Sequence, residues 1–264
     1  MPTSHEGHPL GMTKVGVSGA AGRMGTLVCR TVADTADMEL AVAHDPVAAG
    51  DERCGIPISD DREMLRAAEV VVEFTRPDVV MDNLAEWHRL DRHAVVGTSG
   101  FDAERIAQLR GLWTGGSARC LVVPNFSIGA VTMMRLAEIA APHFAAAEVI
   151  EMHHAAKVDA PSGTAIATAE RIAAAKGHPA ATGGESLPAA RGAAVGGVPV
   201  HSVRLPGLVA HQEVLFGNAG EWLTIRHDTT DRSAFMPGVL LAVRAVADLP
   251  DAVTVGLEGI LGLG

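Results

Sequence analysis

Cysteine is scarce in this sequence of 264 residues, and its three cysteines, Cys29, Cys54 and Cys120, are scattered without CxxC spacing. This pattern favours reduced thiols in a cytoplasmic protein over a disulfide framework or a cysteine-bound zinc ion. Basic residues are outnumbered, since 21 Lys and Arg stand against 31 Asp and Glu and give a net charge of −10. With no run of like charge, we expect no nucleic-acid partner.

Long apolar runs are absent as well. No segment reaches the roughly 18 uninterrupted apolar residues of a membrane span, and residues 1–13 hold neither the apolar run nor the basic region of a signal peptide. We therefore expect a cytoplasmic protein without membrane association, in which residues 1–13 are a flexible extension. Hydrophobic residues make up 48% of the chain, enough for one large α/β domain or two smaller ones.

The first half of the chain alternates short apolar strands with helices. A strand at residues 14–19 runs through a glycine turn into a segment whose apolar residues recur at helical spacing. Four more strands are predicted, at residues 39–45, 69–74, 93–100 and 119–126, with helices at 77–90 and 103–113 between the later ones. Five strands separated by helices predict an α/β fold with a Rossmann-type, doubly wound parallel sheet.

After residue 125 the pattern changes. Helices are predicted at residues 130–143 and 164–176, a Gly/Pro/Ala-rich loop ends at Gly197, and strand-like runs lie at 148–154, 198–205, 208–217 and 221–228. Turn signals between the last runs predict an α+β domain with an antiparallel or mixed sheet. The last helix, residues 233–249, is expected to return to the first domain. The predicted domains are therefore 1–125 with 233–264, and 126–232.

A glycine motif, Gly19-Ala-Ala-Gly22-Arg-Met-Gly25, separates the first strand from its helix. Its spacing is one residue off the standard dinucleotide fingerprint, but glycines there still let the backbone approach a pyrophosphate at a helix N-terminus. A plain strand-to-helix turn also favours glycine. Asp45 ends the second strand, where a carboxylate can accept hydrogen bonds from a ribose, and this favours the dinucleotide site.

The ends of the later strands open onto the same edge of a parallel sheet, where the nicotinamide of a dinucleotide would lie. The predicted cofactor-binding residues are Gly19, Ala20, Ala21, Gly22, Arg23, Met24, Asp45, Gly97, Thr98, Ser99, Val123, Pro124, Asn125 and Phe126. Asp45 repels a 2′-phosphate, and Arg23 is the nearest basic residue that could bind one. We predict use of both NADH and NADPH, with NADH at least as good.

The stretch EMHHAAKVDAPSGTA, residues 151–165, gathers two histidines and one of the few lysines before a helix start. Adjacent histidines on a strand point to opposite faces, so a metal site that adds Asp159 to them is disfavoured and no metal is predicted. Structural roles stay open: a strand histidine is often structural, and Ser162 or Thr164 could simply cap the helix. Asp159 could orient Lys157 or cap the turn.

Several segments together resemble the 4-hydroxy-tetrahydrodipicolinate reductase (dihydrodipicolinate reductase) family: GAAGRMG, EFTRPDVV, VVGTSGF, PNFSIGAV, EVIEMHHAAKVDAPSGTA and RGAAVGGVPVHSVRLPGLVAHQEVLFG. The resemblance covers nearly all of the chain from Lys14 onward. It implies a nicotinamide-dependent enzyme of bacterial lysine and diaminopimelate synthesis that reduces a small dicarboxylate. By the same resemblance the first domain binds NADH or NADPH, and the second binds substrate and forms a homotetramer.

The resemblance also implies roles for the residues of this stretch. His153 becomes the proton donor and acceptor, Lys157 a second proton donor, His154 a substrate contact, and Gly163 with Thr164 donors to a substrate carboxylate. A monomer remains the simple alternative to the tetramer. Two other functions also stay open: a related reductase of another imine or carbonyl, and a catalytically inactive dinucleotide-binding regulator. A regulator has no need of an acid beside an anion-binding loop, which argues against it.

Overall fold

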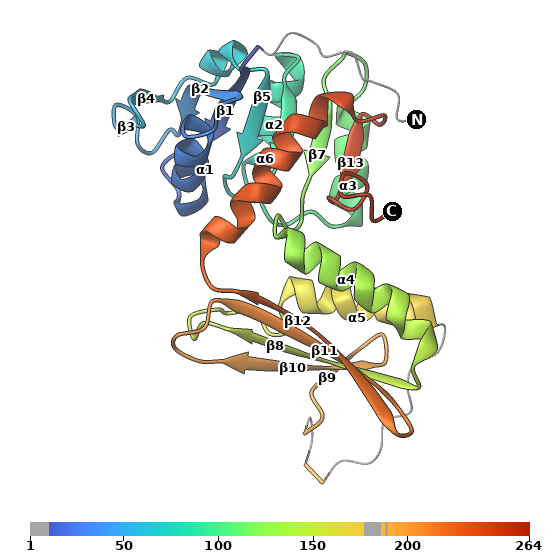
Figure 1. Cartoon of the computed structure of the whole chain (residues 1–264). Helices are drawn as coiled ribbons and strands as arrows, with labels where there is room; N and C mark the ends of the chain where they lie inside the picture. The colour runs from blue at the N-terminus through green and yellow to red at the C-terminus, as the bar shows by residue number, and fades with distance from the viewer. Residues whose placement is uncertain (1–10, 177–185, 188–189) are drawn as a thin grey trace. The chain divides into compact units, whose positions relative to one another are not determined.

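The computed structural model describes residues 11–176, 186–187 and 190–264, and these form two compact units (Figure 1). The first unit runs to Phe126 and resumes over Phe235–Gly262, and the second comprises Ser127–Ala234, to which Leu263–Gly264 are also assigned. The boundaries fall beside the predicted ones at 125/126 and 232/233. Most of the predicted N-terminal extension lies outside the described residues, and Thr13 already belongs to the first strand.

An eight-stranded sheet forms the centre of the first unit. In spatial order its strands are β13 (Val253–Val255), β7 (Cys120–Val122), β6 (His93–Val96), β5 (Val70–Glu73), β1 (Thr13–Ser18), β2 (Met38–His44), β4 (Ile56–Ser59) and β3 (Glu52–Arg53). All neighbours are parallel except β3 and β4, which form a short antiparallel hairpin that periodicity does not predict. The predicted Rossmann-type parallel sheet is confirmed.

Helices cover both faces of this sheet: α1 (Arg23–Ala33) and α6 (Met236–Ala245) on one, α2 (Val80–Arg89) and α3 (Ala103–Leu112) on the other. The strands supply both cores because their side chains alternate. In β5, Val70 and Val72 pack with α1 and α6, whereas Val71 packs with α2 and α3. Near-continuous apolar strands are therefore required, as in other parallel sheets buried on both sides.

The second unit has a five-stranded mixed sheet in the order β12 (Glu221–Thr229), β11 (Ala210–Asn218), β8 (Ala146–His153), β10 (Val198–Arg204) and β9 (Ala193–Val195). β8 runs parallel to β10 and antiparallel to β11. The predicted α+β domain with a mixed sheet is confirmed. β9 lies in the segment predicted as a loop, and it forms because Gly196 and Gly197, both at positive φ, turn the chain back along β10.

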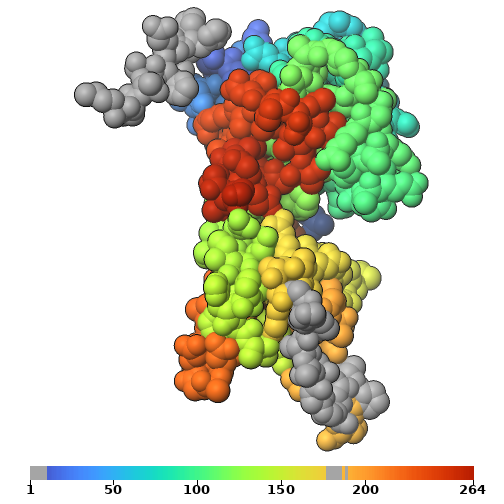
Figure 2. Space-filling view, turned by 90° about the vertical axis from the view of Figure 1, so that its right-hand side faces the viewer, coloured from blue at the N-terminus to red at the C-terminus, as the bar shows by residue number. Residues whose placement is uncertain are grey.

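Two helices, α4 (Ile128–Ala140) and α5 (Gly163–Lys176), lie side by side on one face of this sheet (Figures 1 and 2). Their apolar residues form the core of the unit with Val149, Val214 and Phe216. Short 3₁₀ helices occupy Arg62–Ala67, Ala141–His143, Arg232–Phe235 and Val246–Asp248. Within the described residues no helix is long and apolar enough to cross a membrane.

Candidate functional site

The glycine loop between β1 and α1 is packed so tightly that side chains are excluded. Gly19 has a φ of +83°, and a Cβ on it would lie 2.3 Å from the carbonyl oxygen of Phe74. A Cβ on Gly25 would lie 2.0 Å from the carbonyl oxygen of Gly19. Helix α1 begins after Gly22 with no side-chain cap and no acidic residue in its first turn, so its N-terminus suits an anionic group such as a pyrophosphate.

Asp45 is fixed against this loop. Its Oδ2 accepts a hydrogen bond from the Ala21 N–H at 3.1 Å, and its Oδ1 accepts one from the Val47 N–H at 3.1 Å. Beside it lies a cavity of about 540 Å³ lined by Gly19, Ala21, Gly22 and Asp45 among the predicted residues. The predicted Ala20, Arg23 and Met24 do not line it. A nucleotide with its ribose at Asp45 fits these groups.

Nine further residues line the cavity: His44, Pro46, Val47, Arg62, Phe74, Thr75, Arg76, Val79 and Asn83. Phe74, Thr75 and Arg76 directly follow β5, so the rule that ligands lie beyond the carboxyl ends of parallel strands could have found them. Arg62 follows a short strand that the periodicity does not show, and no sequence signal marked it. Arg62 and Arg76 bring positive charge to a cavity for which only Arg23 was predicted.

The predicted residues after β6 and β7 lie beside those after β5. Gly97 has no room for a side chain, since its Cβ would lie 2.1 Å from the Phe74 ring. The rings of Phe74 and Phe126 are 5.5 Å apart, and Thr98 Oγ1 accepts a hydrogen bond from the Thr75 N–H at 2.9 Å. Of the remaining predicted residues, Val123 is buried, Asn125 is partly buried, and Ser99 and Pro124 are exposed.

A buried carboxylate supports this edge. Glu73, the last residue of β5, is fully buried and accepts hydrogen bonds from Trp87 Nε1 at 2.9 Å, from Asn83 Nδ2 at 3.2 Å and from Thr75 Oγ1. Burial raises the pKa of its carboxyl group, although these donors oppose the rise. Because Asn83 and Thr75 line the cavity, Glu73 fixes two of its walls.

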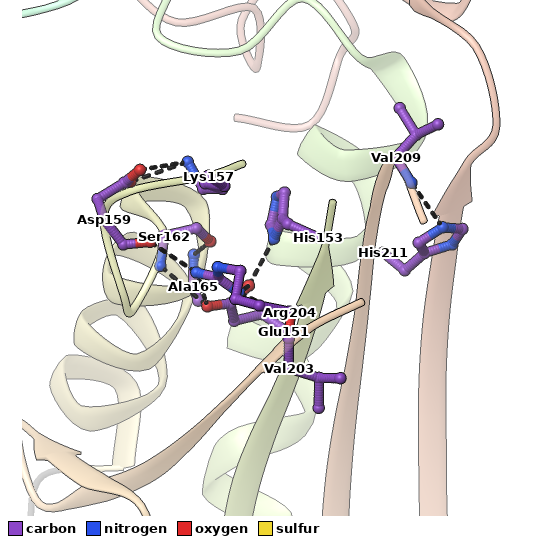
Figure 3. A network of polar contacts seen from close by, with 10 residues as sticks. All are labelled: Glu151, His153, Lys157, Asp159, Ser162, Ala165, Val203, Arg204, Val209 and His211. Carbon is purple, nitrogen blue, oxygen red and sulfur yellow. Dashed lines mark hydrogen bonds and ion pairs between the residues drawn. The ribbon is translucent and has the colours of Figure 1, made fainter. Parts of the chain in front are cut away.

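The second cluster lies at the end of β8 in the second unit (Figure 3). Glu151, fully buried, accepts two hydrogen bonds from Arg204, from Nη1 at 2.9 Å and from Nη2 at 2.7 Å. The same carboxylate contacts His153 Nδ1 at 2.5 Å. Burial lowers the pKa of His153 below its ordinary value, while the carboxylate of Glu151 opposes the shift. Neither Glu151 nor Arg204 was predicted as a site residue.

Lys157 lies in the loop after β8. Its Nζ donates to both carboxylate oxygens of Asp159, at 2.8 and 2.9 Å, and its side chain is only 22% exposed. Of the two roles considered for Asp159, this contact supports the one that orients Lys157. In Figure 3 the side chains of His153 and Lys157 lie on the same side of the network. His154 follows the end of β8, and its carbonyl oxygen accepts a hydrogen bond from the Lys157 N–H.

Helix α5 begins beside these residues. Ser162 caps it, since its Oγ accepts a hydrogen bond from the Ala165 N–H at 3.3 Å, and its own N–H donates to Glu151 Oε1 at 3.3 Å. Gly163 and Thr164 are the first two residues of the helix, and the Cβ position of Gly163 has nothing within 4 Å. The structure thus brings together His153, Lys157 and the helix start. Over the described ranges no group of three His, Cys, Asp or Glu residues could hold a metal ion.

Comparison with known proteins covers almost the whole chain. The family profile described as "Dihydrodipicolinate reductase, N-terminus" matches residues 13–126, and "Dihydrodipicolinate reductase, C-terminus" matches residues 129–261. The 4-hydroxy-tetrahydrodipicolinate reductase of Cutibacterium acnes is 54% identical over 259 residues, with 96% of this chain and 100% of that protein covered. The protein of the same name from Thermobifida fusca is 52% identical, with the same coverage.

A solved structure agrees with these sequence relatives. The dipicolinate-bound dihydrodipicolinate reductase of Paenisporosarcina sp. TG-14 is 37% identical and has a TM-score of 0.84, with 94% of this chain and 99% of that one covered. The apo scyllo-inositol dehydrogenase of Lactobacillus casei has a TM-score of 0.63 at 12% identity, a likeness of fold alone.

Proposed function

The chain belongs to the dihydrodipicolinate reductase family, and from this premise we propose which of its residues bind the cofactor, hold the substrate and move the proton. It is an NAD(P)H-dependent oxidoreductase that reduces 4-hydroxy-tetrahydrodipicolinate to tetrahydrodipicolinate in the diaminopimelate pathway of lysine biosynthesis. This relation favours the reductase over the two alternatives that the sequence left open, a related imine or carbonyl reductase and an inactive regulator.

The first unit is the dinucleotide-binding domain, and we assign its contacts to the glycine loop and Asp45. The loop N–H groups and the start of α1 would hold the pyrophosphate, and Asp45 would accept hydrogen bonds from the ribose. Gly97 to Ser99 and Val123 to Phe126, which follow β6 and β7, would lie along the nicotinamide half. When bound, the reduced nicotinamide supplies the hydride.

The second unit would hold the substrate, a small dicarboxylate. The N–H groups of Gly163 and Thr164 at the start of α5, together with Lys157, would bind its carboxylates, with His154 as a further contact. The bound dipicolinate of the Paenisporosarcina enzyme, a flat ring with two carboxylates, is consistent with this assignment.

His153 would deliver the proton. The reaction expels the hydroxyl group as water and takes up one hydride and one proton, so the ring atom that gains electron density needs an acid beside it. Substrate carboxylates beside His153 would raise its pKa and favour the imidazolium form, against the effect of burial. The observation that carries this assignment is that His153 and the residue that caps α5 both contact the buried carboxylate of Glu151, while Arg204, bound to the same carboxylate, also holds Asp159, the partner of Lys157.

The test is a His153→Ala variant assayed by NADH oxidation with 4-hydroxy-tetrahydrodipicolinate generated in situ from pyruvate and aspartate semialdehyde. Its kcat should fall by about 10²- to 10⁴-fold, the usual range for loss of a general acid, with a smaller change in the substrate KM. NADH affinity and melting temperature should stay near wild type. A stable His153→Ala protein that binds NADH and keeps a near-normal kcat would remove His153 from the mechanism.

We further propose that the enzyme is a cytoplasmic homotetramer. Its scattered cysteines suit a reducing compartment. The sheet face opposite α4 and α5 carries the partly buried apolar residues Ile150, Met152 and Leu215, and Trp222 on β12 is 80% exposed. Such apolar surface on a sheet is commonly covered by another copy of the chain.

A further inference from the structure

Glu151 is an unusual group to find at the centre of a folded unit. Its side chain has no exposed surface, and it lies in β8, the middle strand of the five-stranded sheet. Enclosing a carboxylate is strongly unfavourable unless donors replace the hydrogen bonds of the lost water. Here the donors come from three directions: the guanidinium of Arg204 on β10, the ring of His153 on β8, and the N–H of Ser162 before α5.

We propose that Glu151, held by Arg204, is a positioning residue for the reaction: it fixes the ring of His153 and the start of α5 in one rigid frame. The inference rests on the proposed role of His153 as the proton donor. Nothing requires Glu151 itself to touch the substrate or to exchange a proton.

The contact with Glu151 sets the orientation of the imidazole. Because Nδ1 faces a carboxylate, Nδ1 must carry a hydrogen, and Nε2 becomes the atom that exchanges the proton with the substrate. Burial alone would raise the pKa of Glu151, but hydrogen bonds from Arg204, Ser202 and His153 hold that pKa below its usual range. The carboxylate therefore stays charged and stabilises the imidazolium.

Arg204 extends the frame to the loop that carries Lys157. Besides its two bonds to Glu151, its Nη1 donates to the Val203 carbonyl at 2.8 Å, and its Nη2 donates to the Asp159 carbonyl at 2.6 Å. Asp159 in turn holds Lys157 through its carboxylate. The ion pair of Arg204 with the buried Glu151 thus connects the proposed proton donor, the proposed carboxylate-binding lysine and the capped end of α5.

The charges around His153 give the expected direction of change. Glu151 raises the pKa of His153, whereas burial and the positive charges of Lys157 and Arg204 lower it, and Asp159 pairs with Lys157. Among these groups Glu151 alone favours the imidazolium, and in Glu151→Gln that group is neutral. The pKa of His153 should therefore fall, and since kcat requires protonated His153, the alkaline limb of the kcat profile should move to lower pH.

The same strand offers a matched control. Glu148 also lies on β8, contacts His201 Nε2 at 2.9 Å and accepts from Arg191 Nη2 at 2.8 Å, so it repeats the His–carboxylate–Arg arrangement. An odd sequence separation places it on the opposite face of the strand from Glu151. Glu148→Gln removes an equivalent charge without touching the proposed site, and its kcat profile should match wild type. Because Glu148 shares the sheet face that we propose to pair with another copy, its mass by light scattering is measured as well and should also match wild type.

The experiment compares wild type, Glu151→Gln, Glu151→Asp and Glu148→Gln in the full-length enzyme, by kcat against pH and by ¹⁵N NMR titration of the His153 ring, assigned by its absence in His153→Ala. Glu151→Gln should lower kcat at pH 7 by about 10²-fold. It should also shift both the alkaline limb of the kcat profile and the NMR titration of His153 to lower pH. Glu151→Asp keeps the charge for Arg204 but shortens the reach to His153, so it should fold and still lose at least about 10-fold in kcat.

A double variant completes the test. If Glu151 acts through His153, adding Glu151→Gln to His153→Ala should lower kcat little further, because residues that act as a unit are not additive. If Glu151→Gln folds but neither the alkaline limb of its kcat profile nor its His153 titration shifts, the inference is overturned, even if the melting temperature drops. A normal kcat in His153→Ala would instead overturn the proposed function. If Glu151→Gln does not fold, a wild-type kcat and titration in Glu151→Asp would also overturn the inference.

Discussion

Replacing Gly25 by alanine tests how the first unit holds its cofactor. The added Cβ would lie 2.0 Å from the Gly19 carbonyl oxygen, 2.7 Å from the Gly19 carbonyl carbon and 2.9 Å from Ala20 Cα. An ordinary carbon–oxygen contact is about 3.3 Å or more, so α1 and the loop must separate by about 1 Å. All three atoms belong to the backbone, so no side-chain rotation relieves the contact.

Gly25→Ala has two effects of opposite sign on the free energy of unfolding. Overpacking destabilises by about 1–3 kcal/mol, and alanine recovers about 0.5–1 kcal/mol of helix propensity. The net loss should therefore be up to about 2.5 kcal/mol. The same substitution should also lower the affinity for NADH by about 10- to 100-fold, because it displaces the loop N–H groups by about 1 Å and well-aligned sites are sensitive to such shifts.

The assays are denaturant unfolding and fluorescence titration with NADH. Gly111→Ala is the control, because Gly111 lies in α3 and its Cβ position has nothing within 4 Å. That variant should gain about 0.5–1 kcal/mol and bind NADH normally. Wild-type stability together with wild-type NADH affinity in Gly25→Ala would refute the close approach of α1 to the glycine loop.

Three further predictions concern the cofactor, the substrate and the assembly. We expect NADH to be used at least as well as NADPH. If Arg62 is the residue that contacts a 2′-phosphate, Arg62→Ala should weaken binding of 2′,5′-ADP more than that of 5′-ADP. A larger effect in Arg23→Ala would show that Arg23 is the phosphate partner instead. Lys157→Ala should lower kcat and raise the substrate KM together, whereas His154→Ala should act mainly on KM; an unchanged KM in both would remove them from substrate binding. Light scattering at micromolar concentration should give about four times the 27.3 kDa of one chain, and a mass near one chain would exclude the tetramer.

Most of the fold of the first unit could be predicted from the sequence, because the patterns that specify its strands, helices and turns are local. The period of apolar residues marks buried strands and amphipathic helices, and the motif from Gly19 to Gly25 marks the turn between them. The short hairpin of β3 and β4 gives no such signal, since two to four residues are too few to show a period. Arg62 follows that hairpin, so its place in the cavity could not be predicted.

In the second unit the sequence indicated His153 and Lys157 but not what supports them. Arg204 lies 53 residues after Glu151, and only the pairing of β8 with β10 brings the two together. Which strand neighbours β8 depends on the whole topology, which no local pattern specifies. Glu151 was within reach of prediction, because residues two apart on a strand point to the same face, and Glu151 and His153 are such a pair.

Both units obey one geometric rule. In the first, the cavity-lining residues follow the carboxyl ends of parallel strands: Gly19 after β1, Asp45 after β2 and Phe74 after β5. In the second, among the described strands only β8 and β10 run parallel, and their register places Arg204 beside His153 at their shared carboxyl end. Side chains at the ends of parallel neighbours converge, whereas antiparallel neighbours end at opposite edges. Only the pairing of β8 with β10 therefore brings the carboxyl end of another strand to His153, the proposed proton donor. It gives Glu151 a partner, Arg204, at the point where the chemistry is proposed.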